Sequence, residues 1–294
     1  MIQNSKRKLS GLMLISNTIS HQGLVRDRNE DSYISNANEN IWLVADGVGG
    51  NTAGHIASQL SVQAIERKLR QGSSLLSAIM EANQDLLSAA SQQPDLNGMA
   101  TTIVATKFLG NQYELAWVGD SRAYLIDAEK IYLLSSDHNV ANELYSKGEI
   151  TKQELQYHPG QHELTLALGL GTLTDIPLKV GSLENGSILL LCSDGLSGVL
   201  SDEIIFKTVK SGHSLEQVSQ TLLELVLNAG APDNVTISLV QYIGDPVPEI
   251  STTETLATGD LDVKRLLKVK NKAPLTWGVL FTIMLIMMLL FIIG

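Results

Sequence analysis

The chain has 294 residues, of which 44% are hydrophobic, and a formal net charge of -10. This length and apolar content are enough for one large domain or two small ones, and they exclude a disordered chain. Five of the 21 basic residues follow Asp262 and no acidic residue does, so the earlier part of the chain is the more acidic one. Such a surface repels nucleic acid, so nucleic-acid binding is excluded, and it indicates either a solvated surface or acids gathered around a cation.

The N-terminal residues combine a basic stretch with a short apolar run. Lys6, Arg7 and Lys8 precede the run at residues 12–15, which is too short for the apolar region of a signal peptide. We expect residues 1–11 to form a tail and the apolar run to begin the first strand.

Short apolar runs alternate with turn residues up to about Tyr242. They predict strands at residues 41–45, 101–108, 113–118, 123–126, 131–134, 188–192 and 235–242. The single cysteine, Cys192, lies inside one of these runs. It is therefore expected to be a buried strand residue without an internal disulfide, in a reducing compartment.

Two long helices are predicted at residues 52–70 and 75–91. A later helix is marked by the capping-box pair Ser214 and Gln217, and a glycine and a proline follow its apolar positions. Runs of strands with helices clustered between them indicate an α+β fold rather than a regular parallel sheet. We assign this fold to one domain, residues 12–243.

Acidic residues stand at the ends of several predicted strands. Asp46, Asp120 and Asp194 follow apolar runs within two residues, and Asp233 precedes the last strand. A single aspartate in such a place is more often a turn former, but strands of packed sheets that end at one rim would bring these carboxylates together. Like charges that close require cations, and oxygen donors suit Mg²⁺ or Mn²⁺. Zinc is disfavoured because no Cys or His pair has ligand spacing.

Seven short segments, in order along the chain, carry a family resemblance. They are Gly23–Ser32, Asp46–Gly50, Gly98–Thr102, Gly119–Arg122, Asp137–His138, Ser193–Gly195 and Asp233–Thr236. Each is weak alone, but together they resemble the metal-dependent protein phosphatases known as PPM or PP2C, in particular their bacterial branch. The resemblance covers roughly residues 12–242. It implies a four-layer α-β-β-α sandwich of two antiparallel sheets flanked by helix pairs.

The resemblance also implies a metal centre with two or three Mn²⁺ or Mg²⁺ ions. Asp46 would bridge two ions, the Gly47 carbonyl would complete one ligand shell, and Asp194 and Asp233 would hold the other ion. Asp137 with Asp194 is similar to the pair that binds a third, weaker metal in bacterial members.

The implied reaction is hydrolysis of phosphoserine and phosphothreonine in proteins by a water that two metal ions activate. Arg26 falls where the family places its phosphate anchor, and its planar guanidinium can meet two phosphate oxygens at once. Glu30 and Asp31 would orient metal-bound waters. No covalent phosphoenzyme is needed, so Cys192 is not expected to be a nucleophile.

Three features depart from the family pattern or extend it. Val48 stands where eukaryotic relatives carry a histidine that is a proposed general acid, so protonation of the leaving serine would fall to a metal-bound water. His21 stands where bacterial relatives commonly carry aspartate, and it is either a structural residue or weakens an outer metal shell. Residues 137–165 correspond to the family's mobile flap, whose charges form either a solvated face or a substrate-selecting surface.

The C-terminal region predicts a membrane anchor. From Leu275 to Ile293 no residue is charged, and as a helix this run spans roughly 28 Å, about the thickness of a bilayer's hydrocarbon core. A buried core helix would normally keep a polar face. We therefore expect a polar linker at residues 244–273 and one transmembrane helix at residues 274–294. The basic stretch at residues 264–272 places the domain in the cytoplasm and attracts anionic membrane lipids.

The predicted partners are phosphorylated proteins near that membrane, namely a Ser/Thr kinase and its substrates. Two other functions stay open. A catalytically silent module could keep the fold to bind a phosphoprotein, but it would have no physical reason to retain repelling carboxylates. A two-metal hydrolase of nucleotides or small phosphate esters would share the chemistry, but the order of the motifs disfavours it.

Overall fold

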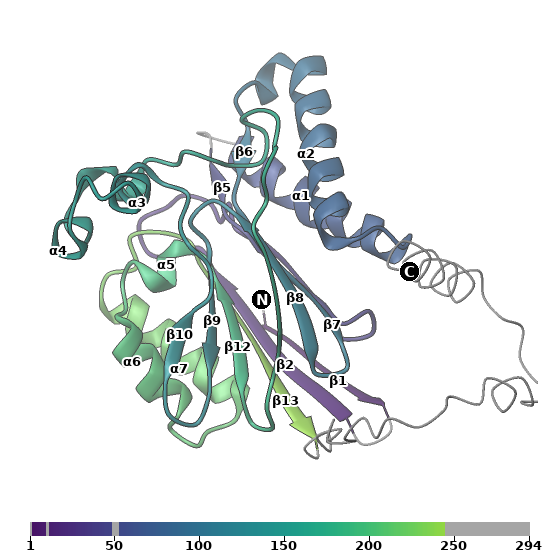
Figure 1. Ribbon diagram of the computed structural model, residues 1–294, viewed down its shortest axis with the longest axis vertical. Helices are drawn as coiled ribbons and strands as arrows, with labels where there is room; N and C mark the ends of the chain where they lie inside the picture. Colours follow the sequence, from purple (N-terminus) through teal and green to yellow (C-terminus); the bar gives the residue numbers. More distant parts are fainter. Residues whose placement is uncertain (1, 10–11, 49–52, 245–294) are drawn as a thin grey trace, which may run out of the picture. The chain divides into compact units, whose positions relative to one another are not determined.

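The computed structural model describes residues 2–9, 12–48 and 53–244 (Figure 1). These residues fall in the first of two units into which the chain divides, Met1–Val247, whereas the second unit, Pro248–Gly294, lies outside them. The predicted transmembrane helix and nearly all of the predicted linker therefore also lie outside the described residues. Within the described ranges, no helix is long and apolar enough to cross a membrane.

Two antiparallel sheets form the centre of the described domain. The six strands of one sheet run in the order β1 (Ile2–Leu9), β2 (Leu12–His21), β13 (Val235–Gly244), β12 (Ile188–Cys192), β9 (Arg122–Ile126) and β10 (Ile131–Leu133). The five strands of the other run in the order β11 (Leu178–Ser182), β8 (Gln112–Val118), β7 (Ile103–Leu109), β4 (Ile41–Ala45) and β3 (Ser32–Asn36). A small separate hairpin pairs β5 (Gly47–Val48) with β6 (Ala100–Thr101).

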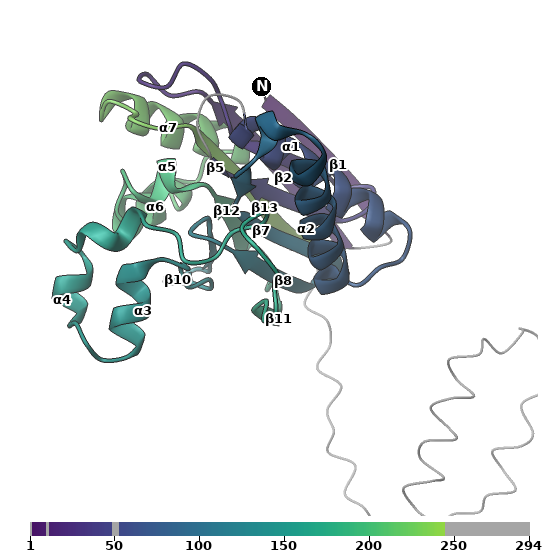
Figure 2. The same cartoon turned by 90° about the horizontal axis from the view of Figure 1, so that it is seen from above.

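Helices cover the outer face of each sheet (Figure 2). The longer pair, α1 (Ala53–Arg70) and α2 (Leu75–Gln92), covers the five-stranded sheet, and α6 (Asp202–Val209) and α7 (Leu215–Asn228) cover the six-stranded one. Short helical segments complete the chain: the 3₁₀ turn Pro94–Leu96, α3 (Val140–Ser146), α4 (Lys152–Leu155), the 3₁₀ turn η3 (Pro159–His162) and α5 (Asp194–Ser197).

The two-residue period of the strands distributes their side chains among three core layers. On β4, Trp42 faces the core between the two sheets, whereas Leu43 faces α1 and α2. On β12, Leu189 faces the same inter-sheet core and Leu190 faces the opposite helix pair. Because both faces of these strands are buried, they read as continuous apolar runs in the sequence. The predicted α+β fold with two antiparallel sheets is confirmed.

The predicted long helices are present, and α7 has the capping box between Ser214 and Gln217. The predicted strands are present too, except that the one predicted at residues 101–108 is divided between β6 and β7, which lie in different sheets. The expected N-terminal tail is wrong in part, because residues 2–9 form β1, paired with β2 from Ile2↔Ile19 to Leu9↔Leu12. This edge strand pairs through its backbone, which does not require an apolar sequence. The strands β3 and β11 were also not predicted.

Candidate active site

Five aspartates gather where strands of the two sheets end. We call Asp31, Asp46, Asp120, Asp194 and Asp233 the acidic cluster. Asp46 follows β4, Asp120 follows β8 and Asp194 follows β12, whereas Asp31 precedes β3 and Asp233 precedes β13. The sequence prediction that strand ends would bring carboxylates together is therefore confirmed.

The cluster members are close enough to shift one another's ionisation. Burial, and then the charges of Asp31, Asp194, Asp120 and Asp233, raise the pKa of Asp46 well above its usual value. Burial raises the pKa of Asp31 to about 7 despite two hydrogen bonds that lower it. Burial and the charge of Asp233 raise the pKa of Asp194. Without a cation, these groups therefore resist ionisation at neutral pH.

The cluster fits divalent cations. The Oδ1 atoms of Asp31 and Asp194 are buried and lack a hydrogen-bond partner within the described part of the chain. An unpaired buried carboxylate oxygen costs free energy that a bound cation offsets, and a set of carboxylate oxygens suits Mn²⁺ or Mg²⁺. Among the described residues, however, no three His, Cys, Asp or Glu side chains already form a closed metal cage. The chemistry of the donor set therefore fits a divalent cation.

The backbone of Asp46 is fixed by Thr101 and Thr102, which belong to the Gly98–Thr102 motif. Thr102 Oγ1 accepts a hydrogen bond from the Asp46 N–H at 2.9 Å, and Thr101 Oγ1 donates to the Asp46 carbonyl at 2.8 Å. Next to it, a Cβ on Gly47 would lie 2.2 Å from the carbonyl oxygen of Gly54 in α1. Only glycine therefore lets the first turn of α1 approach the predicted bridging carboxylate and the predicted carbonyl ligand.

Arg26 lies beside a predicted metal ligand. Its Nη2 donates to Asp233 Oδ2 at 2.6 Å, and the hydrogen bond and charge of Asp233 raise the pKa of Arg26. The Arg26 side chain is 54% exposed. A phosphate bound to Arg26 would take the place of Asp233 in this ion pair, and a cation bound to Asp233 would take the place of Arg26.

The loop that carries Arg26 and Glu30 is tied to β13 by Asn234. Asn234 Oδ1 accepts a hydrogen bond from the Glu30 N–H at 2.8 Å. Asn234 Nδ2 donates to the carbonyls of Gln22 at 2.8 Å and Arg28 at 2.9 Å. The amide has both donors and an acceptor, so one buried side chain can hold three backbone groups of the loop. The sequence indicated this residue only as part of a motif.

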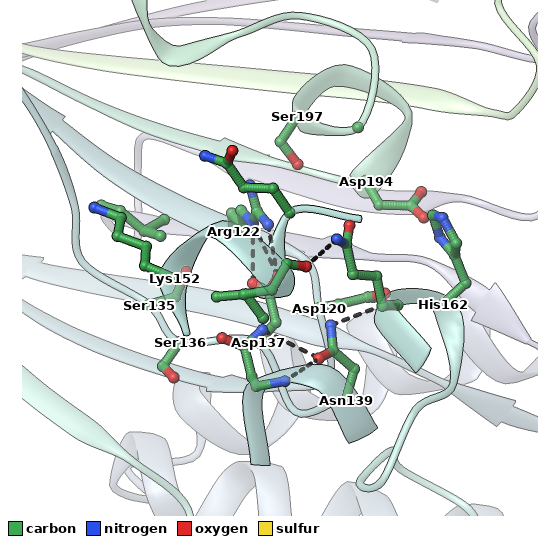
Figure 3. A pocket seen from close by; sticks show the side chains of 16 residues that line it. Asp120, Arg122, Ser135, Ser136, Asp137, Asn139, Lys152, His162, Asp194 and Ser197 are labelled. Carbon is green, nitrogen blue, oxygen red and sulfur yellow. Dashed lines mark hydrogen bonds and ion pairs between the residues drawn. The ribbon is translucent and has the colours of Figure 1, made fainter. Parts of the chain in front are cut away.

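Asp137, which the family resemblance assigns to a third metal ion, is held in an ion pair with Arg122. It is 8% exposed, and its two oxygens accept from Arg122 Nε at 2.9 Å and Nη2 at 2.7 Å (Figure 3). Burial alone would lower the pKa of Arg122, but the hydrogen bond and the charge of Asp137 outweigh burial and raise this pKa. Among the residues that the structure describes, Asp120 is not paired with an arginine in this way: burial, and then the charges of Asp194 and Asp137, raise the pKa of Asp120 to about 7. The geometry therefore favours Asp120 over Asp137 as a partner of Asp194.

A cleft of about 450 Å³ lies between two members of the cluster, Asp120 and Asp194, and residues 137–165, which we call the flap segment. Asp120, Asp137 and Asp194 line it together with Lys152 and His162 of the flap segment. The flap segment contains α3, α4 and η3, and its helices project away from the sandwich (Figure 1). His162 comes from η3 and lies beside Asp194 (Figure 3). The sequence indicated this histidine only as part of the predicted flap at residues 137–165.

The remaining sequence expectations concern single residues. His21 Nδ1 accepts a hydrogen bond from the Gly23 N–H at 2.9 Å, which is a structural contact at the start of the Arg26 loop. Val48 comes two residues after Asp46 in the sequence and is 40% exposed. Cys192 is buried without a disulfide, and burial raises the pKa of its thiol to about 12, which agrees with a structural strand residue.

Comparisons with known proteins agree with this geometry. Residues 20–229 match the family described as protein phosphatase 2C. The serine/threonine phosphatase stp of Listeria monocytogenes is 33% identical over 233 residues, which cover 75% of this chain and 92% of that protein. The serine/threonine protein phosphatase PstP of Mycobacterium tuberculosis is 35% identical over 230 residues, which cover 76% of this chain and 44% of that protein.

A solved structure shows the same fold with metal. The crystal structure of the PstP catalytic domain in complex with two manganese ions matches with a TM-score of 0.71 at 33% identity, over 79% of this chain and 99% of that one. The family match and these relatives span most of the chain. The chain therefore belongs to the protein phosphatase 2C family and is a metal-dependent protein serine/threonine phosphatase.

Proposed function

We propose that the acidic cluster holds two Mn²⁺ or Mg²⁺ ions and that the enzyme uses them to hydrolyse phosphoserine and phosphothreonine in proteins. Asp46, the Gly47 carbonyl, Asp194 and Asp233 are the proposed ligands. Asp120 with Asp194 is the pair that a third ion would use. The observation that carries this assignment is the pair of buried, unpartnered carboxylate oxygens inside a group of five aspartates.

The protein's own groups define the reaction around these ions. When bound, the ions lower the pKa of a water and neutralise charge on the phosphoryl oxygens. Arg26 would hold the phosphate through its planar guanidinium once it leaves Asp233, and a water held by the acidic side chains would attack phosphorus in line. The bond from phosphorus to the serine or threonine oxygen would break in this step, and that oxygen would take a proton from water. Glu30 and Asp31 would accept hydrogen bonds from the waters around the ions and so orient them. Cys192 is buried with a raised pKa and takes no part.

Release of phosphate from a phosphothreonine peptide tests this assignment. The wild-type protein should release phosphate with added Mn²⁺, and chelation should abolish the release. Asp46→Asn, which removes the proposed bridging charge at nearly constant volume, should lower kcat by about 10³-fold, a loss of about 4 kcal/mol in transition-state stabilisation. A wild-type protein that binds phosphopeptide without turnover would indicate a silent module. Turnover of nucleotides in preference to phosphopeptides would indicate a small-molecule hydrolase.

We also propose that residues 274–294 anchor the enzyme in a membrane with the phosphatase domain in the cytoplasm, where it opposes a Ser/Thr kinase. The support is the uncharged run from Leu275 to Ile293 and the basic residues before it. Deleting residues 274–294 should move the protein from the membrane pellet to the supernatant and leave its activity on phosphopeptides unchanged. A deleted form that stays in the pellet would contradict the single anchor.

A further inference from the structure

The carboxylate of Asp31 is held through one oxygen. Ser193 Oγ and Thr236 Oγ1, at the ends of β12 and β13, each donate to Asp31 Oδ2 at 2.7 Å. Oδ1 of the same carboxylate is buried and has no partner within the described residues. Two donors therefore meet on Oδ2, and Oδ1 is the oxygen left for another partner.

The hydrogen bonds that reach Asp31 run in one direction. A hydroxyl has one proton, and Thr236 gives its proton to Asp31, so Ser20 must donate in the 2.8 Å contact between Ser20 Oγ and Thr236 Oγ1. Ser20 Oγ in turn accepts from Asn29 Nδ2 at 2.9 Å. We call Asn29, Ser20 and Thr236 the hydroxyl chain. Because every donor in it points toward Asp31, the bonds polarise one another and favour the ionised carboxylate.

Backbone bonds fix both hydroxyls. Ser193 Oγ accepts from the Thr236 N–H at 2.9 Å, and the Ser193 N–H donates to the Thr236 carbonyl at 3.2 Å. Asn29 closes the network, because its Oδ1 accepts from the Asp31 N–H at 3.1 Å. Ser193 and Thr236 are completely buried. The two donors to Asp31 therefore have little freedom to move.

We propose that Thr236 and Ser193 are positioning residues for the metal centre. By occupying Oδ2 of Asp31 with two donors, they keep the carboxylate in one orientation and present Oδ1 to the ions and their waters. This inference rests on the proposed function, since it gives Asp31 an outer role around the ions. Partners of this kind typically change metal affinity about 10-fold to 100-fold when they are removed.

Thr236→Val tests the proposal because it removes the hydroxyl at nearly constant volume. The matched control is Thr18→Val. Thr18 Oγ1 bonds Ser238 Oγ at 2.8 Å in the next hydroxyl pair along β2 and β13, and both residues are completely buried. Mn²⁺ affinity is measured by the electron paramagnetic resonance signal of free Mn²⁺. Thr236→Val should bind Mn²⁺ about 10-fold more weakly, Thr18→Val should change less than about twofold, and Thr236→Ser should restore affinity to within about threefold.

Two outcomes would overturn the proposal. One is a Thr236→Val protein that binds Mn²⁺ as tightly as the wild type, and the other is an equal loss in Thr236→Val and Thr18→Val, which would show general damage to the core. Thermal melts establish that each variant is folded. If Thr236→Val does not fold, Ser193→Ala is measured in its place with the same expectations. Failure of the proposed function would show differently, as wild-type protein that binds Mn²⁺ but releases no phosphate from phosphopeptides.

Discussion

Arg26 is shared between two tasks, because the residue proposed to hold phosphate is bonded to a proposed metal ligand. Arg26→Ala removes the planar donor for phosphate, so kcat/KM for a phosphopeptide should fall about 100-fold, or about 2.7 kcal/mol. The same change frees Asp233 from a competing cation. Mn²⁺ affinity should therefore stay equal or rise. Steady-state kinetics at saturating Mn²⁺, with a separate Mn²⁺ titration, measure the two effects.

Arg26→Lys is the matched control for this prediction. It keeps the positive charge near Asp233 but lacks the planar fork, so it should recover a part of the lost kcat/KM. If Arg26→Ala lost Mn²⁺ affinity together with activity, the guanidinium would support the metal centre rather than the phosphate.

Asp137 and Asp120 lie in different electrostatic environments, because Asp137 is paired with an arginine and Asp120 faces other carboxylates. Asp137 neutralises Arg122 in a largely buried pair, so Asp137→Asn leaves an uncompensated charge and should lower the free energy of unfolding by about 3 kcal/mol. Asp120 faces other carboxylates, so Asp120→Asn should not destabilise the metal-free protein. Urea denaturation in the presence of a chelator measures both. Equal destabilisation by the two variants would contradict the assignment.

At the scale of elements, the close approach of α1 to the β5 hairpin positions the Gly47 carbonyl. Gly47→Ala would place a methyl group against the Gly54 carbonyl, and backbone cannot yield as a flexible side chain can. The variant should therefore lose about 3 kcal/mol of stability and bind Mn²⁺ more weakly. Gly72→Ala is the control, because it has a positive φ but open space around it and should lose only about 1 kcal/mol. Urea denaturation and Mn²⁺ titration check both variants.

Strands whose two faces are both buried gave the clearest signal in the sequence, although the partly exposed β10 was predicted as well. The strands β4 and β12 appear as unbroken apolar runs, whereas β1 is a polar edge strand and β11 exposes Val180, so neither has an apolar signal. In the site, positions next to predicted strands singled out Asp46, Asp120, Asp194 and Asp233. The assignment of Asp137 to a third ion came from the family resemblance, and the sequence alone could not show that Arg122 reaches Asp137 through the fold. The hydroxyl chain likewise joins residues more than two hundred positions apart.

At the scale of the whole molecule, the buried carboxylates of the acidic cluster repel one another when they ionise. The free energy of unfolding should therefore depend on pH. Burial raises the pKa of Asp31 and Asp120 to about 7, whereas in the unfolded chain both ionise near 3.8. Between these values the folded state binds more protons than the unfolded state. The free energy of unfolding should therefore fall as pH rises from about 4 to about 7, and the part due to these two groups should level off above that range.

Metal binding should change this dependence, because Mn²⁺ binds the ionised carboxylates and competes with protons for them. In thermal melts of the metal-free protein, the midpoint temperature should decrease as the pH rises from 5 to 7.5. Excess Mn²⁺ should raise the midpoint temperature most at pH 7.5, because fewer protons must leave the site there. Asp120→Asn should flatten the metal-free slope. If Mn²⁺ raised the midpoint equally at both pH values, the protons and the ions would not share these carboxylates, and the cluster would not be the metal centre.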